Sequence, residues 1–114
     1  KFNPSLGRLS AVEFNSLSDI RFKDSLRRIE MPLEKIECLT GYHFRYTETK
    51  ALSAGLMAQD VMEVLPELVI ADAENGDRLT LNYNGLSGLL VEAVKALMAE
   101  VSQLKAEVTK LKGA

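Results

Sequence analysis

The sequence predicts an α+β protein in which a small globular part precedes a long carboxyl-terminal helix that forms a coiled coil. Two observations predict this fold class. Leucine and valine recur at heptad spacing near the end of the chain, and short helical and strand patterns alternate before them. A length of 114 residues suits one small domain and an extended helix, not two domains.

A leucine recurs at every seventh position of the carboxyl-terminal segment, and a valine lies four residues after each of the first three leucines. Glu100 with Lys105, and Glu107 with Lys112, have the offset at which parallel neighbouring helices exchange salt bridges. A helix packed only on its own domain would show a wider apolar stripe. We therefore expect residues 85–112 to form a parallel coiled coil. Its seam is Leu90, Val94, Leu97, Val101, Leu104, Val108 and Leu111.

The middle of the chain predicts a short helix and a strand. Pro32 fits the first position of a helix and Gly41 the residue past its end, so residues 32–40 are expected to be helical. Aromatic and polar residues then alternate, which predicts a strand with one buried face formed by Tyr42, Phe44 and Tyr46.

A second short helix and a hairpin are predicted before the coiled coil. Apolar residues at helical spacing over 56–65 stop at Pro66. Strands over 68–71 and 78–83 flank a polar turn, 72–77, which contains Asn-Gly and is longer than a two-residue hairpin loop. Asn84 or Ser87 is expected to cap the long helix.

Composition argues against several classes of partner. The net charge of −2 does not suit a large nucleic-acid interface. Charged residues and glycines interrupt the apolar stretches well short of a bilayer span, so no membrane partner is expected. Cys38 and His43 cannot bind zinc without further ligands, and neither a metal nor a cofactor is predicted. We expect Cys38 to be a buried structural thiol.

The run from Ser18 to Lys23 places a hydroxyl, a carboxylate and two cations together. By residue type alone, such a cluster is typical of a solvent-facing turn. The offset of five residues puts Ser18 and Lys23 on opposite faces of a strand and roughly 140° apart on a helix. Only a bend or a subunit interface could therefore bring them together.

Three motifs occur in order along the chain: Ser18-Asp19-Ile20-Arg21-Phe22-Lys23, then Gly55-Leu56-Met57-Ala58-Gln59-Asp60-Val61 with Leu65-Pro66-Glu67, then Leu81-Asn82-Tyr83-Asn84-Gly85-Leu86. With the heptads, they resemble the intramolecular chaperone domains at the carboxyl end of bacteriophage tailspikes, endosialidases and tail fibres, the peptidase S74 type. Tyr46 departs from the pattern, because the family commonly has tryptophan there. The exchange keeps an amphipathic ring.

The resemblance implies a domain that forms a homotrimer, holds the upstream part of the same polypeptide in register, and then cuts itself off between Leu17 and Ser18. It implies that Ser18 is the nucleophile and Lys23 the general base. Asp19 and Arg21 are supporting candidates. Residues 1–17 would be an extended arm that ends the upstream fibre or spike protein, and residues 18–114 the chaperone domain. Such a domain would act in the host cytoplasm during phage assembly and be absent from the mature virion.

Two alternatives remain open: a permanent trimerisation module that is not cleaved, and an unrelated coiled-coil interaction domain. Valine at a with leucine at d favours two strands, whereas the family resemblance implies three. A lysine acts as a base only as the neutral amine, which burial favours. We therefore expect trimerisation to complete a desolvated pocket around Lys23.

Overall fold

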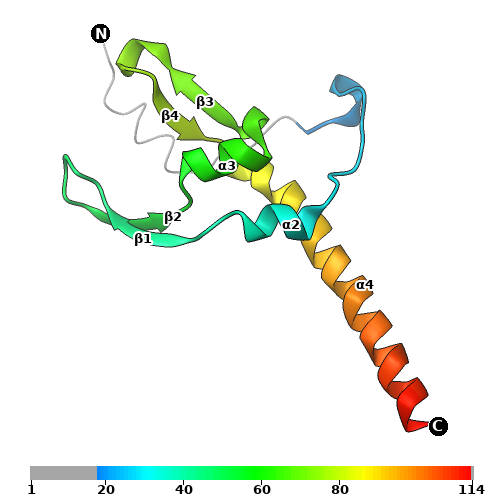
Figure 1. Ribbon diagram of the computed structural model, residues 1–114. Helices are drawn as coiled ribbons and strands as arrows, with labels where there is room; N and C mark the ends of the chain where they lie inside the picture. The colour runs from blue at the N-terminus through cyan, green and yellow to red at the C-terminus, as the bar shows by residue number, and fades with distance from the viewer. Residues whose placement is uncertain (1–17, 114) are drawn as a thin grey trace.

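The computed structural model describes residues 18–113, so the predicted arm of residues 1–17 and the carbonyl side of the Leu17–Ser18 bond lie outside the described residues. A small body lies at one end of a long helix, α4 (Leu86–Lys112), which runs away from it (Figure 1). The radius of gyration is 19.5 Å, whereas a compact chain of this size has about 13 Å. The predicted α+β class and the long terminal helix are confirmed.

The body consists of two short helices and two separate antiparallel hairpins (Figure 1). Each hairpin forms its own two-stranded sheet, and short 3₁₀ turns connect several of the elements. The elements are α2 (Pro32–Glu37), β1 (Tyr42–Arg45), β2 (Leu52–Gly55), α3 (Ala58–Val64), β3 (Val69–Asp72) and β4 (Arg78–Leu81), with 3₁₀ turns η1 (Ile20–Phe22), η2 (Pro66–Leu68), η3 (Ala73–Asn75) and η4 (Tyr83–Gly85).

The predicted hairpin is β3 with β4. Asp72 pairs with Arg78 at its closed end. The Asp72 carboxylate accepts hydrogen bonds from the Glu74 N–H at 3.2 Å and from the Asn75 side-chain amide at 2.6 Å. Gly76 has a φ of 71°, a left-handed conformation that glycine adopts without a steric penalty. The polar turn therefore closes the hairpin with its own side chains.

The other hairpin was predicted only in part. The strand over the aromatic residues is β1, but its partner β2 was missed because Gly55 was interpreted as the start of a helix. The residues of β2 include serine, alanine and glycine, which have weak strand preference. The expected buried face is also wrong for the single chain, since Tyr42 is 45% exposed and Tyr46 is 54% exposed. Tyr46 packs edge to face against Phe44, with 5.2 Å between the ring centroids, but residues 18–113 bury neither tyrosine.

A small core joins α3 to the start of α4. Val61, Leu65, Leu86 and Leu89 are buried in one cluster, and partly buried side chains from α2 and β4 pack against it. Leu68 lies so close to Gly85 that a side chain at this position would collide with it. The core is thin, so the body leaves much of its apolar surface uncovered.

Two details of the short helices differ from the prediction. α2 ends at Glu37, earlier than expected, and Cys38 is its C-cap residue. Cys38 is exposed, so the predicted buried thiol is wrong. α3 begins at Ala58, two residues after the predicted start, because Leu56 links it to β2 and Met57 is its N-cap residue in extended backbone.

The start of α4 lacks the predicted side-chain cap. Its N-cap residue is Gly85, and no side chain caps the helix there. Ser87 lies inside the helix, where its hydroxyl donates to the Asn84 carbonyl at 2.8 Å. The Asn82 side chain instead caps the preceding turn by accepting from the Gly85 N–H at 3.3 Å. The chain thus enters α4 through a 3₁₀ turn.

Candidate functional site

A single tight turn organises the predicted dyad. η1 is capped by Asp19, whose side chain accepts from the Arg21 N–H at 2.9 Å. The backbone closes the turn with hydrogen bonds from Phe22 N–H to the Asp19 carbonyl at 3.0 Å and from Lys23 N–H to the Ile20 carbonyl at 3.1 Å. Lys23 then returns to extended backbone. The turn therefore reverses the chain between Ser18 and Lys23.

This reversal brings the two predicted catalytic side chains together. Lys23 Nζ donates to Ser18 Oγ at 3.1 Å, within the 2.6–3.2 Å over which a base can take a hydroxyl proton. The sequence allowed contact only across a bend or an interface, and the bend suffices. A hydroxyl beside a lysine amine is the arrangement of an activated nucleophile once the amine is neutral. The catalytic roles of both residues remain predictions.

Asp19 and Arg21 stabilise the same turn. Arg21 Nη2 lies 2.6 Å from Asp19 Oδ2, and Arg21 Nε lies 3.1 Å from the same oxygen. The Arg21 side chain, and after it the Arg21 backbone N–H, lower the pKa of the Asp19 carboxyl below its ordinary 3.8. The carboxylate in turn raises the pKa of the Arg21 guanidinium above its ordinary value. The pair thus links the N-cap residue of η1 to the middle of the turn.

The pKa of Asp19 is lower in the folded chain than in the unfolded chain, so its carboxylate stabilises the folded state. This stabilisation is full above the ordinary pKa and is lost as the pH falls through the lowered pKa. Arg21→Gln should raise the Asp19 pKa toward its ordinary value. Carboxyl-carbon NMR titration measures this shift. Arg27→Gln, which removes an exposed arginine beyond the turn, is the control and should leave it unchanged. An unchanged titration in Arg21→Gln would contradict the pairing.

The dyad is open to solvent in the single chain. Ser18 and Lys23 are both exposed. The apolar neighbours in the turn are exposed as well, with Ile20 at 66% and Phe22 at 68%. Water therefore reaches both groups, and nothing in the described chain favours the neutral amine by burial.

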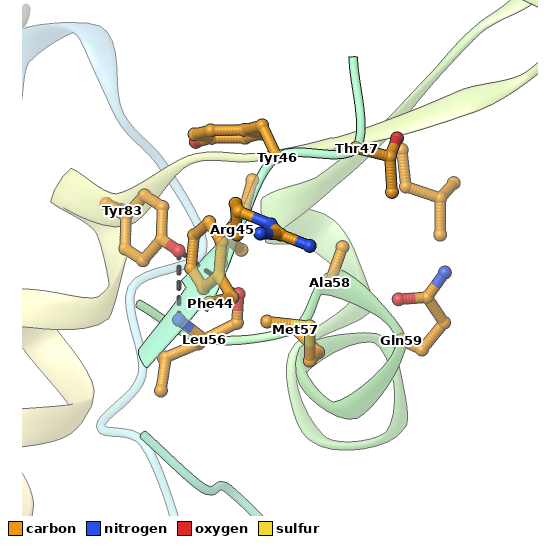
Figure 2. Close-up of a pocket in the computed structure, with 11 residues that line it drawn as sticks. Phe44, Arg45, Tyr46, Thr47, Leu56, Met57, Ala58, Gln59 and Tyr83 are labelled. Carbon is orange, nitrogen blue, oxygen red and sulfur yellow. Dashed lines mark hydrogen bonds between the residues drawn. The ribbon is translucent and has the colours of Figure 1, made fainter. Parts of the chain in front are cut away.

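A separate apolar hollow of about 500 Å³ lies between β1, the start of α3 and β4 (Figure 2). Phe44, Tyr46 and Met57 contribute to its wall, and Arg45 is its cation. The Tyr83 hydroxyl accepts from the Leu56 N–H at 3.0 Å and lies 3.2 Å from the Leu56 carbonyl, to which it donates (Figure 2). Its hydrogen-bonding capacity is thus used within the fold. Ser18 and Lys23 do not line this hollow, and no pattern in the sequence predicted it.

The predicted seam lies bare along α4. Every seam side chain is about half exposed or more, from 48% at Val101 to 78% at Leu111. The body covers Leu86, Leu89 and Ala93 instead. From Leu97 to Lys112 the helix is exposed on all sides. The coiled coil itself remains a prediction.

Other kinds of site lack support among residues 18–113. No helix in this range is long and apolar enough to cross a membrane. Nor does this part of the chain bring together three histidine, cysteine or acidic side chains that could hold a metal ion. The described candidates are therefore the dyad, the hollow and the bare helix face.

Comparison with known proteins agrees with the motifs. Residues 18–70 match the family described as chaperone of endosialidase, peptidase S74. This segment of the chain is similar to the chaperone-of-endosialidase family. Relatives include the long tail fibre protein Gp37 of Salmonella phage S16, which is 31% identical over 93% of this chain, and that of Enterobacteria phage K3, which is 38% identical over 79%. The chain spans 15% and 8% of the length of these two relatives.

The match to the chaperone-of-endosialidase family begins at Ser18, the first residue after the predicted cleavage position. The family description names a chaperone, and the relatives named above are long tail fibre proteins of phages. The sequence located the dyad because its members lie in one local motif. It did not indicate the ion pair between Arg28 and Glu92, which are 64 residues apart.

Proposed function

We propose that this chain is a carboxyl-terminal chaperone that trimerises, holds an upstream tail fibre β-structure in register, and then releases itself by cleavage between Leu17 and Ser18. The 3.1 Å contact between Lys23 Nζ and Ser18 Oγ, at the residue where the family match begins, carries this proposal. Assembly takes place in the host cytoplasm, and the released domain is absent from the virion.

The position of Ser18 constrains the chemistry. Its Oγ attacks the carbonyl carbon of the peptide bond that precedes it, while the neutral Lys23 amine takes the hydroxyl proton. Lys23 then gives this proton to the leaving Ser18 nitrogen, and the Leu17–Ser18 amide becomes an ester on Oγ. Water hydrolyses the ester, which yields the Leu17 carboxylate, the regenerated Ser18 hydroxyl and a free Ser18 amine. Every step is intramolecular except the attack by water.

The exposed apolar face of α4 supports the proposal that assembly precedes cleavage. Val91 and Met98 occupy e positions beside the seam and are 55% and 62% exposed. In a parallel coiled coil the e side of one helix faces the g side of its neighbour, and Leu86 and Ala93, at g positions, carry the body. The body of one copy would then contact Val91 and Met98 of its neighbour. These contacts would widen the interface beyond the side chains at the a and d positions. A wider interface favours three helices over two.

A second function, a permanent trimerisation module without cleavage, is favoured by one observation. Both dyad side chains are exposed, so a single chain does not keep water from the amine. The two functions share the fold and the seam. They differ only in whether assembly buries Lys23.

A cleavage assay with a folded reporter domain placed before Lys1 tests the proposal. We expect a denaturing gel to show two fragments, and mass spectrometry to find Ser18 at the new amino terminus. Sedimentation of the 12.6 kDa chain should give three copies. An intact trimer would favour the permanent module, whereas a dimer would favour an unrelated coiled-coil interaction domain.

A further inference from the structure

The dyad sits at the far end of an unsupported stretch of chain. Residues 23–30 contain neither helix nor strand, and every residue from Ile20 to Arg28 is exposed. The turn fixes Ser18 against Lys23 locally. The position of the turn relative to the rest of the molecule must therefore depend on the point where this stretch joins the body.

Three successive residues make that junction. Arg28 donates to Glu92 Oε1 through Nη2 at 2.8 Å and through Nε at 3.1 Å. Ile29 packs against the core cluster, and its Cδ1 lies beside Gly88 of α4. The Glu30 carbonyl accepts from Lys35 Nζ of α2 at 2.6 Å. We call Arg28, Ile29 and Glu30 the anchor.

The ion pair of the anchor is better formed than an ordinary surface pair. The Glu92 side chain is only 17% exposed, although that of Arg28 is 74% exposed. Lys95 approaches the other carboxylate oxygen, Oε2, at 3.8 Å. Two guanidinium donors on one largely covered carboxylate fix the direction of the arginine as well as its distance.

The anchor avoids the face of α4 that assembly needs. At about 100° per residue, Glu92 and Gly88 lie roughly 180° around the helix from the Leu90 and Val94 seam. Self-association through the seam therefore leaves the ion pair in place. Each copy in an assembly would then hold the start of its cleavage segment at the same height and angle relative to α4.

We propose that the ion pair between Arg28 and Glu92 is a positioning element for self-cleavage: it ties the segment that carries Ser18 and Lys23 to the assembly helix. This inference rests on the proposed function, since it concerns the regulation of the same site. Glu92 never touches the reacting atoms. Through Arg28, Glu92 determines where η1 lies when the copies assemble. The position of η1 in turn determines whether a neighbouring copy can cover Lys23.

The test compares Glu92→Gln with the matched control Glu63→Gln, the same substitution at an exposed carboxylate of α3. We expect Glu92→Gln to slow cleavage of the reporter fusion about three- to five-fold, as suits a partly exposed ion pair. Sedimentation and the melting temperature should stay near wild type. The double variant Arg28→Glu with Glu92→Arg should restore most of the rate, which a loss of packing would not allow.

A second readout does not depend on cleavage. In uncleaved Ser18→Ala protein, adding Glu92→Gln should lower the backbone ¹⁵N heteronuclear NOE of residues 24–30, whereas adding Glu63→Gln should not. Equal cleavage rates and equal NOE values in the two variants would overturn the anchor alone. A wild-type fusion that assembles and is never cleaved would overturn the proposed function, and the role of the anchor with it.

Discussion

A Lys23→Arg protein should assemble as wild type does and remain uncut between Leu17 and Ser18. Arginine keeps the positive charge and can still donate to Ser18 Oγ, but its guanidinium does not lose a proton in a protein. A positioned general base contributes roughly 10²- to 10⁴-fold to a rate, so cleavage should disappear over the time in which wild type is cut completely. A denaturing gel of the reporter fusion measures the loss.

Two comparisons separate this effect from general damage. Lys50 is an exposed lysine in the turn between β1 and β2, and the Lys50→Arg protein should be cut at the wild-type rate. Hydroxylamine should trap the proposed ester in wild type as a Leu17 hydroxamate, and no hydroxamate should form in Ser18→Ala. Cleavage of Lys23→Arg at a rate close to wild type would show that Lys23 is not the base.

Sequence reasoning succeeded where one local pattern decides the structure. Pro32 begins α2, Asp72 to Gly76 close the β3–β4 hairpin, and the heptads run through α4. In each case the determining residues lie within a few positions of one another. The same holds for Ser18 and Lys23, because the four residues between them form a turn that Asp19 caps.

Prediction from the sequence failed where contacts between distant segments determine the structure. β2 forms because β1 offers it an antiparallel partner, although its own residues have weak strand preference. Cys38 lies at the end of α2 with no element over it, which its residue type does not reveal. Arg28 and Glu92 meet only because α2 and the core place the anchor against α4. Such contacts depend on packing that a single sequence does not display.

Val101→Asp should leave α4 helical and abolish assembly. Val101 lies at the centre of the seam and is 48% exposed in the single chain. Burial of the seven seam side chains is worth on the order of 10–20 kcal/mol per chain before entropy. A carboxylate at this position would bring like charges together from every copy in an apolar interface. Sedimentation should report a monomer, and the melting temperature should fall.

The control is Ser102→Asp, which places the same charge on the next residue at an outward position, and it should assemble as wild type. The decisive measurement is cleavage of the Val101→Asp fusion. The dyad is formed within each chain but is exposed there, so a monomer holds both groups at the right distance and still lacks the burial that yields a neutral amine. Cleavage should therefore fall at least about ten-fold. A monomer that cuts itself as fast as wild type would mean that the turn alone suffices and that the coiled coil only aligns the chains.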